Sequence, residues 1–128
     1  MAGDALRFSR IPGEFAVCRL PSDAPIPAWA LDQPVFSITR TAEELSILCP
    51  AASVPREVKS ECGWTCLKLE GPFPFTLTGV LASFLSPLAT ARISIIAIST
   101  FDTDYVLVKE EALGTALRAL QNAGHHLA

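Results

Sequence analysis

The second half of this chain repeats the pattern of the first half, and that repeat constrains the fold more than any other feature. "FAVCRL" (residues 15–20) and "WTCLKL" (64–69) share their apolar pattern and a basic fifth residue at an offset of 49. "SITRTAEELSILC" (37–49) lies over "AISTFDTDYVLVK" (97–109) without a gap at an offset of 60. The two offsets differ by 11 residues (60 − 49), about three helical turns. The second half therefore has room for a longer first helix.

The order strand, helix, strand, strand, helix is thus predicted twice, which is the βαββαβ pattern of a ferredoxin-like unit. We predict an α+β fold of two tandem ferredoxin-like units, with antiparallel sheets and helices on one face. Residues 1–62 would form the first unit, with a shortened first helix, and residues 63–128 the second. Each half has about 60 residues, so the two are expected to share one core. The predicted strands span residues 15–20, 35–41, 45–49, 64–69, 92–100 and 104–109, and the predicted helices about 27–31, 77–86 and 110–124.

Composition excludes several classes of protein. Half of the 128 residues are hydrophobic, so a core can form, and the formal net charge is −3. The ten Lys and Arg residues are scattered, without a basic stripe, which disfavours nucleic-acid binding. The N-terminus lacks the continuous apolar core of a signal peptide. Polar residues and a proline interrupt the apolar window 78–100, so a helix, a turn and a strand are predicted there, not a membrane span.

The cysteines indicate a reduced, cytoplasmic protein without a metal site. Cys18, Cys49 and Cys66 lie inside apolar strand-like runs, where cysteine acts as a small hydrophobe. Cys62 and Cys66 are spaced C-x3-C, and no second pair has zinc spacing. His125 and the histidine after it are expected to be frayed tail residues. No cofactor is predicted.

No catalytic motif is found, so an enzyme is not expected. The sequence contains no G-x-S-x-G, P-loop or G-x-G-x-x-G motif. Cys62 or Cys66 could act as a nucleophile, but only Lys59 and Lys68 lie nearby in sequence to activate them. Turnover that is lost on substituting either cysteine would revive this alternative.

The segment "STFDTDYVLVKEEAL", preceded by "TGVLASFLSPLATARISIIAI", resembles tandem ACT-domain proteins. The similar groups are small bacterial ACT-domain proteins and the CASTOR-type cytosolic arginine sensors, with the ACT pairs of aspartokinases more distant. The resemblance covers the second half well and the first half only through the internal repeat. It implies that a free amino acid binds at an interface between ACT units and that the chain regulates a partner.

The resemblance to the arginine sensors also implies a ligand site in two segments, one at a helix start and one at a strand-to-strand turn. The resemblance implies an acidic residue at the position of Leu77, and this departure from it argues against arginine as the ligand. The implied ligand-binding residues are Leu77, Gly79, Val80, Thr100, Phe101 and Asp104.

The same residues can be read without the family. A helix start offers unpaired N–H groups to a carboxylate, and a carboxylate beside a turn can pair with an ammonium or guanidinium group. Gly79 would either admit a ligand or permit tight helix packing. Asp104 and Asp102 would either contact a ligand or accept N–H bonds in the turn. Phe101 would either cover a ligand's aliphatic stem or pack on the core.

At an offset of 60, the first-repeat counterparts of Phe101 and Asp104 are Thr41 and Glu44, which indicates a degenerate site there. We therefore predict an amino-acid-binding regulatory module, completed by a second copy in a homodimer. The alternative is a protein-interaction module without a ligand, because sheet edges pair readily across subunits.

Overall fold

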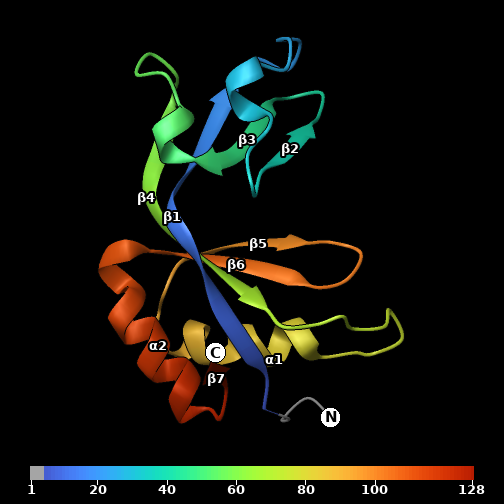
Figure 1. The fold of residues 1–128 in the computed structure, drawn as a ribbon, viewed down its shortest axis with the longest axis vertical. Coiled ribbons are helices and arrows are strands. Elements are labelled where there is room, and N and C mark those ends of the chain that lie inside the picture. The colour runs from blue at the N-terminus through green and yellow to red at the C-terminus, as the bar shows by residue number, and fades with distance from the viewer. Residues whose placement is uncertain (1–4) are drawn as a thin grey trace. The chain divides into compact units, whose positions relative to one another are not determined.

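The computed structural model describes residues 5–128 and divides the chain into two compact units. The N-terminal unit is Gly13–Trp64, and the C-terminal unit is Thr65–Ala128 together with the chain up to Pro12. Strand β1 (Arg7–Leu20) and strand β4 (Ser60–Leu69) each continue from one unit into the other (Figure 1).

The predicted boundary between residues 62 and 63 therefore falls inside β4. The start of β1, which we expected in the first unit, belongs with the second. The reason is the length of β1, which has 14 residues. The carbonyl oxygen of its first residue, Arg7, accepts a 2.8 Å hydrogen bond from the N–H of Glu70 in the C-terminal unit.

The N-terminal unit contains strands and short 3-10 turns. Its strand order is β2-β3-β1-β4, with β2 spanning Ser37–Arg40 and β3 spanning Leu45–Pro50. The β1–β3 and β2–β3 pairs are antiparallel. The proline-rich segment forms only the 3-10 helix η1 (Ala28–Ala30), as predicted, and a second 3-10 helix, η2 (Ala51–Ser53), follows β3. Its core consists of Ala16, Cys18, Ala30, Leu45, Ile47 and Cys49.

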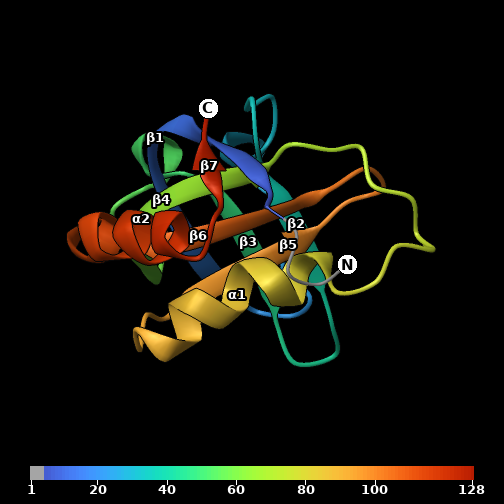
Figure 2. The same ribbon diagram turned by 90° about the horizontal axis from the view of Figure 1, so that it is seen from below.

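The C-terminal unit is mixed α/β, with two helices packed on one sheet. Its strand order is β7-β1-β4-β6-β5, where β5 (Ile95–Ser99) and β6 (Asp104–Lys109) form an antiparallel hairpin. The short β7 (His126–Leu127) runs parallel to the start of β1. Helix α1 spans Val80–Thr90, and a 3-10 turn, η3 (Glu110–Ala112), leads into helix α2 (Leu113–Asn122). Figures 1 and 2 show both helices on the same side of the β5–β6 hairpin.

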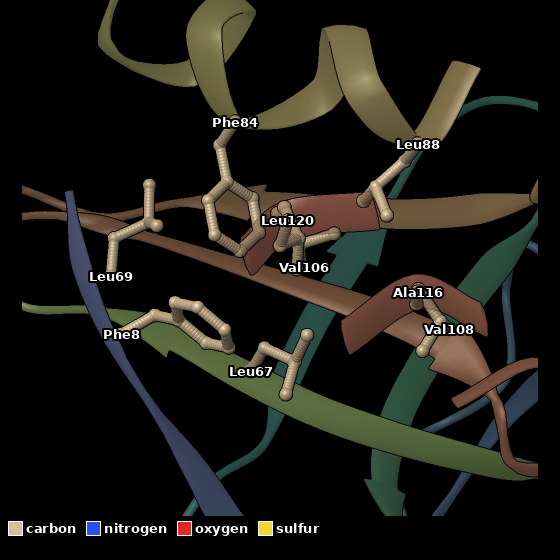
Figure 3. Close-up of a cluster of buried hydrophobic side chains, with 9 residues drawn as sticks. All are labelled: Phe8, Leu67, Leu69, Phe84, Leu88, Val106, Val108, Ala116 and Leu120. Carbon is tan, nitrogen blue, oxygen red and sulfur yellow. The ribbon is translucent and has the colours of Figure 1, made fainter. Parts of the chain in front are cut away.

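The core of this unit explains why both helices share one face. Phe84 and Leu88 point from α1 toward the strands, and the ring of Phe8 contacts that of Phe84 edge-on at 5.2 Å between centroids (Figure 3). Burying such aromatic rings contributes several kcal/mol, roughly 3–5 for a fully buried phenylalanine. The buried cluster consists of Phe8, Leu67, Leu69, Phe84, Leu88, Val106, Val108, Ala116 and Leu120.

Helix α1 begins and ends about three residues later than predicted. Leu77 N–H bonds to Pro74 O in a turn, and Gly79 adopts the left-handed conformation with φ of 80° before the first helical residue. The threonine at position 76 therefore does not cap the helix. At the other end, Pro87 lies inside α1 and does not stop it.

A buried histidine explains how α1 tolerates that proline. A proline at position 87 cannot donate to the carbonyl four residues earlier, which is Ser83 O. The Nε2 of His125 lies 3.1 Å from Ser83 O and donates the missing bond, while Nδ1 accepts from Leu6 N–H at 3.1 Å. The expectation that His125 is a frayed tail residue is wrong, because its side chain is 2 % exposed and bonded at both ring nitrogens.

The two hairpins correct the alignment of the internal repeat by one residue. Arg40 pairs with Leu45 across one turn, and Ser99 pairs with Asp104 across the other. The structural offset is therefore 59 (104 − 45), and the counterpart of Asp104 is Leu45, not Glu44. A slip of one residue exchanges the two faces of a strand. Strands β3 and β6 each contain at least three consecutive apolar residues, so alternation in the sequence did not fix the register.

Candidate functional site

An open cleft of about 310 Å³ lies in the C-terminal unit, between the start of α1 and the β5–β6 turn. Figures 1 and 2 place the β4–α1 loop and this turn at the same end of the unit. All six predicted ligand-binding residues line the cleft, although they come from segments more than twenty residues apart. Those residues are Leu77, Gly79, Val80, Thr100, Phe101 and Asp104.

The turn on one side of the cleft is built by threonines. Thr100 N–H donates to Thr103 O at 2.8 Å, and the Thr100 hydroxyl accepts from Thr103 N–H at 3.3 Å. The Thr103 hydroxyl is buried and donates to Leu69 O at 2.7 Å, which fixes the turn to β4. The alternative that Asp102 or Asp104 accepts the turn's N–H bonds is therefore not supported, because the Thr100 hydroxyl accepts the bond from Thr103 N–H.

Asp104 occupies the first position of β6, at the edge of the cleft. Its side chain is half-buried, and Oδ1 accepts a 2.5 Å hydrogen bond from the hydroxyl of Ser99, its partner across the hairpin. Asp102 also lines the cleft but is exposed, and its backbone carbonyl accepts from Phe73 N–H at 2.8 Å. The cleft's charged side chains are thus carboxylates, and no cationic side chain lines it among residues 5–128. Its field favours a ligand with a positive group.

Phe101 does not pack on the core, so that alternative is wrong. Its ring is 78 % exposed and contacts Phe75, itself 74 % exposed, edge-on at 5.0 Å between centroids. Phe75 lies in the β4–α1 loop, so the two rings come from the two segments that line the cleft. They present apolar surface that a bound molecule would cover.

The start of α1 contributes partial positive charge to the cleft, in contrast to the carboxylates at the turn. The first helical bond joins Ser83 N–H to Gly79 O, so the N–H groups of residues 80–82 precede the helical ladder. Such groups carry a partial positive charge that favours an anion. Gly79 itself is explained by its φ of 80°, a conformation that costs other residues about 1–2 kcal/mol.

The β4–α1 loop contributes residues that the sequence analysis missed. Phe73, Pro74 and Phe75 line the cleft, and a Cβ added at Gly71 would lie 2.9 Å from Asp102 O. That close approach holds the loop against the turn. The only sequence signal was the segment "GPFPF", whose two phenylalanines each follow a proline and fit neither a strand nor a helix.

The cysteines are separate from this cleft. No disulfide joins the four cysteines, which all lie within residues 5–128, and Cys18, Cys49 and Cys66 are buried as predicted. Burial raises the pKa of Cys66 to about 12 and, with the nearby Cys49, that of Cys18 to about 11. These thiols therefore remain protonated at neutral pH, which makes them weak nucleophiles.

No group of His, Cys, Asp or Glu side chains among residues 5–128 is arranged to hold a metal ion. None of the helices formed by these residues has the length and apolar character needed to cross a membrane.

The chain belongs to the ACT-domain family. A model of the ACT domain matches residues 59–122, half of the chain, and includes every residue of the cleft. A second model, of an N-terminal domain, matches residues 13–57.

Three relatives set this assignment in context. A crystal structure of a protein from Agrobacterium tumefaciens is 41% identical, with a TM-score of 0.93, and the match covers 98% of this chain and 93% of that one. The human "Cytosolic arginine sensor for mTORC1 subunit 1" is 38% identical over 66 residues, 51% of this chain but only 20% of the sensor. The regulatory subunit of aspartate kinase from Thermus thermophilus shares the fold, with 13% identity, a TM-score of 0.59, and coverage of 86% and 91%.

Proposed function

We propose that this chain is an amino-acid-sensing regulatory module whose ligand binds in the cleft between α1 and the β5–β6 turn. The observation that carries the proposal is the meeting of a helix start and the Asp104 carboxylate on one cleft. A free amino acid carries a carboxylate and an ammonium on one carbon. Its carboxylate would accept from the N–H groups that begin α1, and its ammonium would pair with Asp104.

The remaining predicted residues have positions consistent with this arrangement. Gly79 orients the first N–H groups, and Val80 and Leu77 supply apolar wall. The Thr100 hydroxyl is engaged within the turn, so we assign it to holding the turn in shape. Phe101 would close over the ligand from the exposed side.

We also propose the finer architecture: two tandem ACT-like units, paired as a homodimer in the cytoplasm, with the ligand at an ACT–ACT interface and no catalytic activity. The strand orders β2-β3-β1-β4 and β5-β6-β4-β1 support it, because each matches the order of a ferredoxin-like sheet. The human relative's name, a cytosolic arginine sensor, supports both the ligand class and the location. The openness of the cleft to solvent leaves room for a second copy to complete it.

A calorimetric titration with each of the twenty amino acids tests the ligand proposal. We expect at least one to bind, and a ligand at 100 times its Kd to stabilise the fold by about 2.7 kcal/mol. The variant Asp104→Asn should weaken that binding about 10- to 100-fold, since it removes a charge-assisted bond. The matched control is Asp102→Asn, which removes the exposed neighbouring charge and should change the Kd less than about threefold. Equal effects of both variants, or no binding at all, would contradict the proposal.

The second candidate is a protein-interaction module that needs no ligand. Strand β5 ends the sheet order, and Ile96 and Ile98 on it are only half-buried. Such an edge can add a strand from another chain. A partner recovered by pull-down with equal yield in the presence and absence of amino acids would favour this function over sensing.

A further inference from the structure

A second cavity, of about 210 Å³, adjoins the cleft at the start of α1. It shares four lining residues with the cleft: Phe73, Leu77, Gly79 and Val80. Its other walls come from the segment before β1 (Ala5 and Leu6), from Thr78, which precedes the N-cap Gly79, and from Ser83 in the first turn of α1. The two cavities therefore lie next to each other at the start of α1.

The two cavities differ in charge. The cleft contains the carboxylates of Asp102 and Asp104, whereas no charged side chain among residues 5–128 lines the second cavity. Its side-chain polar groups are the hydroxyls of Thr78 and Ser83. Moving a cationic or anionic side chain there would remove it from water without a partner, at a cost of several kcal/mol.

We propose that this second cavity receives the side chain of the bound amino acid and that the ligand therefore has a mid-sized apolar side chain, such as leucine, isoleucine or methionine. The inference rests on the proposed function, because it assumes that the α-ammonium pairs with Asp104. Asp104 is then already neutralised and cannot also pair with a cationic side chain. The apolar faces of Phe73, Leu77 and Val80 gain contacts with an aliphatic side chain and none with a charged one.

Titration of the native protein with leucine, methionine, alanine, arginine and glutamate tests the proposal. Leucine has three more carbons than alanine, and each buried CH2 contributes about 0.8 kcal/mol, so leucine should bind about 50-fold more tightly than alanine. Arginine and glutamate should bind no more tightly than alanine, because their charges would lie unpaired in the second cavity.

Two variants locate the side chain. Thr78 lines the second cavity but not the cleft, and Thr78→Trp should fill it. We expect this variant to weaken leucine binding at least 10-fold and alanine binding less than threefold. The matched control is Thr90→Trp, an equal change at an exposed position at the far end of α1, which should alter neither. Leu77→Glu places a carboxylate on the wall shared by both cavities and should shift the preference toward arginine or lysine.

The possible outcomes distinguish a failure of the apolar side-chain preference from a failure of amino-acid sensing itself. Arginine or lysine binding more tightly than leucine to the native protein would overturn the inference and leave amino-acid sensing intact. Leucine binding that Thr78→Trp leaves unchanged would overturn the placement of the side chain. If none of the twenty amino acids binds, the proposed function fails and the inference fails with it. A native protein that prefers leucine and loses that preference in Thr78→Trp supports both.

Discussion

The two hairpins of the molecule have the same turn and different surroundings. Thr41 N–H donates to Glu44 O at 2.9 Å in the N-terminal unit, just as Thr100 N–H donates to Thr103 O at 2.8 Å in the C-terminal unit. The next residue is Leu45 in one, with 0 % exposure, and the half-buried Asp104 in the other.

The segment before each hairpin differs as well. In the N-terminal unit it forms only the 3-10 turn η1, capped by a proline, whereas in the C-terminal unit it forms the 11-residue helix α1. The turn geometry alone therefore does not make a candidate site. The proposed site combines a helix start with an acidic residue beside the turn, and the C-terminal hairpin has both.

The largest expected effect comes from placing an aspartate in the N-terminal hairpin at the position that corresponds to Asp104. Leu45→Asp buries an unpaired carboxylate in the core of its unit, and we expect it to lower the free energy of unfolding by at least about 4 kcal/mol. Urea denaturation measures this. The control is Ser46→Asp on the opposite face of β3, where the side chain is half-buried and the expected loss is about 1 kcal/mol. Equal losses would show that Leu45 does not face the core.

A second test concerns helix α1, which has no counterpart of similar length in the N-terminal unit. His125→Ala leaves Ser83 O and Leu6 N–H without their partners, and we expect a loss of about 3 kcal/mol in the free energy of unfolding. Pro87→Ala restores a backbone donor to Ser83 O, so in the His125→Ala background it should recover about 1 kcal/mol. If the effects of His125→Ala and Pro87→Ala on the free energy of unfolding simply add in the double variant, His125 does not replace the hydrogen bond that Pro87 cannot make.

The reverse substitution, at Asp104, should reduce the free energy of unfolding less than Leu45→Asp does. Asp104→Leu gives the C-terminal hairpin the residue of the N-terminal one, and it removes the bond from Ser99 at a half-buried site. We expect a change of about 1 kcal/mol or less in the free energy of unfolding, by urea denaturation. A loss as large as that of Leu45→Asp would mean that Asp104 is primarily structural.

The start of α1 provides a smaller test. Gly79→Ala places a Cβ on a residue with φ of 80°, which should cost about 1 kcal/mol of unfolding free energy. Gly114→Ala is the control, because this glycine lies inside α2 and alanine there should stabilise by up to about 1 kcal/mol. Changes of the same sign at both positions would contradict the conformational explanation.

A last expected effect is a pH dependence from the buried thiols. Burial raises the pKa of the Cys66 thiol from 9.0, its ordinary value in an unfolded chain, to about 12 in the folded protein, so only the unfolded thiol ionises between these pH values. Its contribution to stability is complete below pH 9 and falls as pH rises toward 12. Urea denaturation at pH 8 and pH 10 should show a shallower decrease for Cys66→Ala than for the native protein. Parallel decreases would show that other groups cause the dependence.

The sequence predicted the segments of the site better than the details around it. The six proposed ligand-binding residues were named from the resemblance, and they line one cleft because a helix start and a turn in a ferredoxin-like order lie at the same end of the sheet. The register of the repeat was wrong by one residue, because continuous apolar runs such as "YVLV" lack the alternation that fixes a strand's faces. The role of His125 was also missed, since a donor 42 residues from Ser83 leaves no local pattern.

The sequence by itself determined the class of elements and their order, because apolar periodicity, prolines and glycines act over a few residues. It also determined that the second half carries the longer helix and the acidic turn. Only the tertiary structure decided that β1 continues from one unit into the other, that His125 completes a helix interrupted by Pro87, and that Leu45 matches Asp104. The physical reason is that these features depend on pairing and burial between segments far apart in the chain, where the gain comes from satisfying buried polar groups and filling a core.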